Sequence, residues 1–142
     1  MQNVAQLFLR LSIGTGYLVF GLDRLGVWGK NGEKGVSWGD WQHFLKYAEE
    51  VMGFLPASLT GVLAIIATIA EIGFGILLIL GKWTKLSAIG SGVLALSFAI
   101  AMTISFGIVS PLSYSVFTVS AASFLLATVS NYKWSLDNAF SK

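Results

Sequence analysis

The sequence predicts an all-α membrane protein: a bundle of four transmembrane helices, with a short amphipathic interfacial helix between the first two spans. Charged residues make up 11% of the chain, against about a quarter in soluble domains, and hydrophobic residues make up 55%. Several apolar segments are about as long as the roughly 20 residues that a helix needs to cross a bilayer. At 142 residues, the chain is predicted to form one transmembrane domain, residues 1–142.

The first two spans are each interrupted by one ionisable residue. Residues 4–22 are apolar apart from Arg10 and are predicted to form span one. Pro56 suits the first turn of a helix, and residues 56–80 are apolar apart from Glu71, so they are predicted to form span two.

The last two spans come from one long uncharged stretch. Neither a charged residue nor a histidine occurs in residues 86–132, which is about twice the length of one span. Gly107 and Pro111 provide a break, which predicts span three at residues 86–106 and span four at residues 111–130. An even number of spans places both termini on the same side of the membrane.

The segment between spans one and two carries charges of both signs and must lie in water. Within it, aromatic and aliphatic residues recur at helical spacing over residues 38–52, with polar residues on the opposite face. Ser37 and Asp40 resemble a capping box, and Gly53 suits the end of the helix. The pattern predicts an amphipathic helix at the membrane interface.

Several kinds of chemistry are excluded by composition. The chain has no cysteine, so it has neither a disulfide nor a thiolate metal site, and its one histidine, His43, leaves too few ligands for a transition metal. No metal and no covalently bound cofactor are predicted. The net charge of +2 comes from scattered residues, which argues against nucleic-acid binding.

The buried charges Arg10 and Glu71 are the first candidates for a site, because an unpaired charge within a span costs at least a few kcal/mol. Counted from the predicted ends of their spans, Arg10 lies about 9 Å deep and Glu71 about 13 Å deep from the same membrane face. We therefore expect an ion pair between them. It could fix the packing of spans one and two, or line a pocket for a ligand headgroup or a proton.

Three short patterns resemble the DoxX family of small four-span bacterial membrane proteins, and together they cover most of the chain. The first follows Arg10, the second follows Glu71, and the third lies near the C-terminus. Their matching residues are Arg10, Gly14, Gly21 and Arg24; Glu71, Gly75, Gly81, Thr84 and Lys85; and Ser135, Leu136 and Asp137.

The resemblance implies a four-helix membrane bundle in the inner (plasma) membrane and makes Arg10 and Glu71 family features. It also implies supporting roles for Gly14, Gly21, Arg24, Gly75, Thr84 and Lys85. Members are associated with quinone-linked sulfur oxidation and with membrane complexes that handle oxidative stress.

Three functions follow as hypotheses. The first is an accessory or quinone-contacting subunit of a membrane redox complex, binding a quinone or lipid through Arg10 or Arg24 and requiring redox partner proteins. The second is a membrane assembly or chaperone-like factor without catalysis. The third is a small-solute or proton pathway with Glu71 as the titrating group. The chain alone is not expected to be an enzyme, no catalytic residue is assigned, and a homo-oligomer is compatible with all three.

Orientation rests on lysines. Sequence charge is balanced between the two sides, but the two-lysine turn directly between spans two and three weighs more than lysines spread through the long loop. This predicts cytoplasmic termini.

Overall fold

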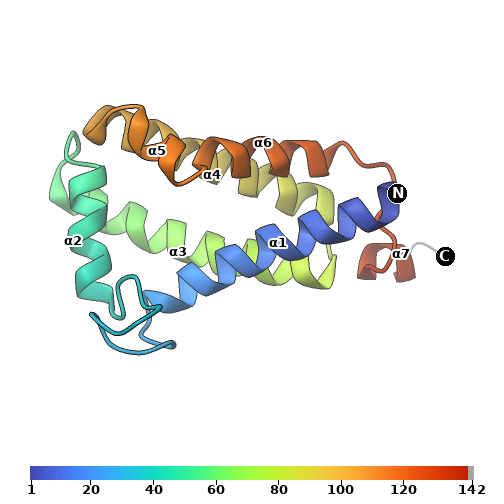
Figure 1. The fold of residues 1–142 in the computed structure, drawn as a ribbon, viewed down its shortest axis with the longest axis horizontal. Coiled ribbons are helices and arrows are strands. Elements are labelled where there is room, and N and C mark those ends of the chain that lie inside the picture. The colour runs from blue at the N-terminus through green and yellow to red at the C-terminus, as the bar shows by residue number, and fades with distance from the viewer. Residues whose placement is uncertain (141–142) are drawn as a thin grey trace.

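The computed structural model describes residues 1–140, and this part of the chain is all-helical, without a strand (Figure 1). The predicted fold class is confirmed. Three helices are long and apolar enough to cross a membrane: α1 (Gln2–Asp23), α3 (Ala57–Leu80) and α4 (Thr84–Phe106). They agree closely with the three segments expected from the sequence. The last two residues of the predicted domain lie outside the described residues.

The fourth apolar segment returns alongside α4 as two shorter helices, α5 (Val109–Ser113) and α6 (Val116–Ala127). One continuous helix over residues 111–130 was expected. The break falls at Ser115, whose φ of 56° lies in the left-handed region and cannot continue a right-handed helix.

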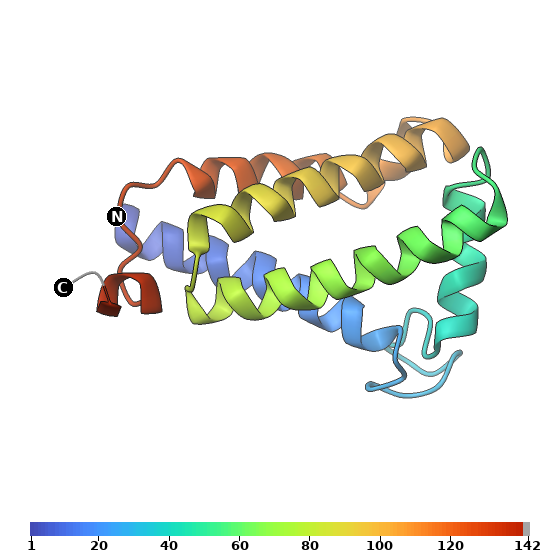
Figure 2. The same ribbon diagram turned by 180° about the vertical axis from the view of Figure 1, so that it is seen from behind.

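α1 packs against α3, and α4 against α6. The N-terminus, the last helix α7 (Leu136–Phe140) and the turn between α3 and α4 lie at one end of the bundle, which we call the terminal end; α2 and the long loop lie at the other, the loop end (Figures 1 and 2). α1 and α3 cross with their backbones in contact at Gly14 and Gly75: a Cβ on either glycine would lie 2.9 Å from the carbonyl oxygen of the other. Close approach of this kind is how membrane helices associate in the absence of a hydrophobic drive.

The amphipathic helix is α2 (Trp41–Val51), which crosses the loop end of the bundle (Figure 1). Its buried residues Phe44 and Ala48 pack on Ala64 of α3. The cap expected at Ser37 is wrong: Asp40 is the N-cap, and its carboxylate accepts a 2.9 Å hydrogen bond from the backbone N–H of His43. The three-residue shift leaves Trp38 in the loop.

A short helix, α7 (Leu136–Phe140), follows α6 and lies at the terminal end beside the N-terminus of α1 (Figure 1).

Candidate functional site

Glu71 is paired with Arg24 and not with Arg10. The Nη2 atom of Arg24 lies 2.7 Å from Oε2 of Glu71, and both side chains are 4% exposed. Nη1 of Arg24 also donates a 2.9 Å hydrogen bond to the hydroxyl of Thr68. The expected Arg10–Glu71 ion pair is therefore wrong.

The relative level of α1 and α3 explains the error. Gly14 contacts Gly75 and Ile79, so the next turn of α1 towards the N-terminus places Arg10 beside the end of α3. A Cβ on Gly81 would lie 2.8 Å from Cζ of Arg10. Glu71 precedes Gly81 by ten residues, which corresponds to about 15 Å along the axis of α3. The sequence estimate treated the two helix ends as level, whereas α1 extends beyond α3.

Arg10 is 1% exposed and is surrounded by backbone carbonyl groups. It donates hydrogen bonds of 2.9 Å to the carbonyl oxygens of Leu78 and Trp134, and longer ones of 3.5 Å to those of Ile79 and Lys133. Since these acceptors belong to α3 and to the segment after α6, Arg10 fastens the C-terminal segment to the bundle.

Arg24 has an aromatic and acidic environment instead. Its guanidinium carbon lies 3.9 Å from the ring centroid of Phe44 and 5.2 Å from that of Trp38, within the range of cation–π attraction. The neighbouring carboxylate of Asp23 accepts hydrogen bonds from the backbone N–H groups of residues 37–39, the shortest being 2.7 Å from Trp38. Asp23 thus holds the loop that covers Arg24. The sequence had led us to expect that Asp23 and Arg24 lie in the solvated loop, whereas both side chains are buried.

An apolar groove of about 260 Å³ lies beside this cluster, between the end of α1, α2 and α3. Thr68 is the polar residue among those lining it, and its hydroxyl donates to the carbonyl oxygen of Ala64 while accepting from Arg24. One side chain therefore connects the groove to the buried ion pair. The groove is lined by Leu25, Trp41, Ile65, Thr68, Ile69 and Ile72.

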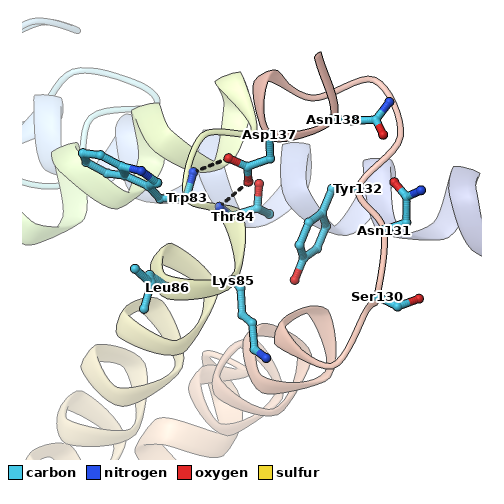
Figure 3. A pocket seen from close by; sticks show the side chains of 9 residues that line it. All are labelled: Trp83, Thr84, Lys85, Leu86, Ser130, Asn131, Tyr132, Asp137 and Asn138. Carbon is cyan, nitrogen blue, oxygen red and sulfur yellow. Dashed lines mark hydrogen bonds between the residues drawn. The ribbon is translucent and has the colours of Figure 1, made fainter. Parts of the chain in front are cut away.

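The residues expected from the other patterns lie at the terminal end. Asp137 accepts hydrogen bonds of 2.7 Å from the backbone N–H groups of both Trp83 and Thr84 at the start of α4 (Figure 3). Thr84 is buried, whereas Lys85 is exposed and lines a second cavity. Thr84 and Lys85 are thus separated from the Arg24–Glu71 pair by most of the bundle.

The DoxX family model matches residues 5–106, which include Arg10, Arg24 and Glu71. The chain belongs to the DoxX family. This DoxX protein has apolar helices of spanning length and is a multi-pass membrane protein. No curated protein and no solved structure matches it.

Among residues 1–140 of this DoxX protein, no group of three or more histidine and acidic residues is placed to hold a metal ion. Gly14, Gly21 and Gly75 serve helix packing: a Cβ on Gly21 would lie 2.7 Å from Ile72, just as Gly14 and Gly75 contact each other. The arrangement best suited to a ligand is the apolar groove with the Thr68 hydroxyl and the Arg24–Glu71 pair behind it.

Proposed function

We propose that this DoxX protein is an accessory subunit of a membrane redox complex and that it contacts a quinone in the groove beside Arg24 and Glu71. The observation that carries the proposal is an apolar groove of about 260 Å³, one of whose lining residues, Thr68, is hydrogen-bonded behind it to a buried arginine. This volume is just below the range of about 300–1,000 Å³ for small-molecule sites, which suits a ring headgroup whose apolar tail remains in the lipid.

The chemistry of a quinone matches this environment. Its flat ring is apolar, and its carbonyl oxygens accept hydrogen bonds. Nε of Arg24 is buried and has no hydrogen-bond partner among the described residues, and Arg24 is adjacent to Leu25, which lines the groove. A buried donor without a partner is costly, so a ligand oxygen that approached it would gain more than an ordinary hydrogen bond.

The chain needs a partner for electron transfer. It has no cysteine, and residues 1–140 contain no cluster of metal ligands. In the proposed role, the bundle positions the quinone while a partner subunit supplies the electron carrier.

An assembly factor is the second candidate, and the Arg10 network favours it. Arg10 uses its hydrogen bonds on backbone carbonyl groups, which is a structural role. A buried pair at Arg24 and Glu71 could be structural in the same way. A proton or solute pathway receives less support, because Glu71, its titrating group, is only 3% exposed and is paired with Arg24.

We further propose a plasma-membrane location with cytoplasmic termini. Lys82 and Lys85 lie in a short turn that directly joins two spans, where basic residues weigh most in setting orientation, whereas Lys30, Lys34 and Lys46 are spread through the long loop.

The test compares two tryptophan variants on the outward face of α3. Ile69→Trp would fill the groove, whereas Ile66→Trp adds the same bulk at a neighbouring exposed position that does not line it. We expect the wild-type protein and the Ile66→Trp variant, released gently from their native membrane, to retain quinone in native mass spectra, and Ile69→Trp to retain about tenfold less. Equal retention in both variants would contradict the groove assignment. Recovery of partner proteins without quinone would favour the assembly factor.

A further inference from the structure

A second cavity, of about 440 Å³, opens at the terminal end of the bundle, far from the proposed quinone groove. It lies between the start of α4 and the segment that follows α6. Figure 3 shows the ring of Tyr132 in the middle of the lining residues, with Lys85 and Leu86 on one side and Ser130 and Asn131 on the other. Lys85 and Leu86 belong to α4, whereas Ser130 and Asn131 belong to the non-helical segment after α6. The cavity is therefore lined by two parts of the chain.

The position of this cavity matches the interface between lipid and water. Trp83 and Leu86 are 61% and 69% exposed and form its outer edge, immediately before and within the first turn of an apolar helix. Tryptophan at the end of a span is typical of the headgroup level of a bilayer. Its other lining residues include the exposed polar side chains of Ser130 and Asn131.

Two side chains of opposite charge, Lys85 and Asp137, line this cavity. Asp137 keeps its negative charge, but its two carboxylate oxygens already accept hydrogen bonds from the backbone N–H groups of Trp83 and Thr84, and the positive charge of Arg10 acts on it. Lys85 is exposed and has no carboxylate within ion-pair distance among the described residues. An ammonium group beside hydroxyl and amide donors is suited to phosphate oxygens.

We propose that this cavity binds the headgroup of an anionic phospholipid from the leaflet at the terminal end. Lys85 contacts the phosphate, Ser130 and Asn131 donate hydrogen bonds to the oxygens of the phosphate and glycerol, and Trp83 and Leu86 contact the start of the acyl chains. Basic side chains in pockets between transmembrane helices bind the headgroups of anionic lipids. The site is independent of the quinone proposal, because it uses different residues at the other end of the bundle.

The test uses the full-length protein, stripped of lipid in detergent and titrated with phosphatidylglycerol, with bound lipid counted by native mass spectrometry. We expect one retained lipid per chain and about fivefold weaker retention in Lys85→Gln, the factor typical of one lysine near an anionic surface. The matched control is Lys82→Gln, which removes the same charge from the same turn; Lys82 lies beside Trp83 but does not line the cavity. Its retention should stay within about twofold of wild type.

Three results would overturn the proposal. Equal losses in the two lysine variants would indicate a general attraction of anionic lipid to this end of the protein. Equal retention of phosphatidylcholine and phosphatidylglycerol would show that net lipid charge is not recognised. Saturable binding of inorganic phosphate that displaces the lipid and is lost in Lys85→Gln would assign the cavity to a free anion instead.

Discussion

Arg10 lies in the N-terminal half of α1 and Arg24 directly follows its last residue, and the protein neutralises their charges in different ways. Arg24 has a carboxylate partner, Glu71, and two aromatic rings. Arg10 has carbonyl oxygens from α3 and from the C-terminal segment. A carboxylate compensates the full charge with one partner, whereas carbonyl groups compensate it by several partial charges, and several segments of backbone must then be held in place.

The Arg24–Glu71 pair and the carbonyl network around Arg10 therefore differ in what they can do. The pair at the loop end contains an ionisable carboxylate, and it lies beside an apolar groove. The carbonyl groups around Arg10 cannot change charge. Their hydrogen bonds to Arg10 hold α1, α3 and the segment after α6 together. The following substitutions test the comparison.

The largest effect is expected for Glu71→Gln, which leaves Arg24 buried without its carboxylate. Loss of one partner of a buried ion pair costs about 3–5 kcal/mol, whereas replacement of both partners by apolar residues is often neutral. Arg24→Met combined with Glu71→Met should therefore recover much of the stability. Unfolding in detergent, followed by circular dichroism, measures both.

A double-mutant cycle gives the control. Arg10→Met and Glu71→Gln should be additive within about 0.5 kcal/mol, because the two side chains share no partner. Strong coupling between residues 10 and 71, or none between residues 24 and 71, would contradict the pairing seen in the structure.

A smaller and more local effect is expected for Arg10→Met. It removes hydrogen bonds from a charged donor, each of which contributes about 1.5–3 kcal/mol, but it also removes the buried charge, so the net loss should be about 2 kcal/mol. Amide hydrogen exchange should increase over residues 133–140 and remain unchanged in α2. Equal increases at the two ends of the bundle would show that Arg10 does not act as a local fastening.

The boundaries of the first three spans could be predicted because they depend on local information. Apolar length, Pro56 before α3 and Gly81 after it define a helix without reference to the rest of the fold; Gly81 has a φ of 68°, as expected for a glycine at the end of a helix. The break at Ser115 carried no comparable signal, because serine occurs in both helices and turns.

The partner of Glu71 could not be predicted, because it depends on how far α1 extends past α3. That offset is set by the contact between Gly14 and Gly75, which the resemblance to the DoxX family marked as supporting residues without indicating that they touch each other. Arg24 was assigned to water because it follows the apolar segment, yet the folded loop and α2 cover it. Residue type thus identified the charges to be neutralised, and the relative level of the helices determined their partners.

The smallest of these effects is expected for Asp137→Asn, at the terminal end. Asp137 caps the start of α4, and loss of its charge should cost about 1 kcal/mol. Partial burial alone would raise the pKa of Asp137, but hydrogen bonds from Thr84 and Trp83, together with the charge of Arg10, lower the pKa below its usual range. A carboxyl with a lowered pKa in the folded state stabilises the protein above its unfolded pKa of about 4, and this contribution is lost as the pH falls through the folded value. The melting temperature of the wild-type protein should therefore fall below about pH 4 by more than that of Asp137→Asn. Identical pH profiles would show that the carboxylate does not contribute its charge to the cap, and would leave Arg10 as the main attachment of the tail.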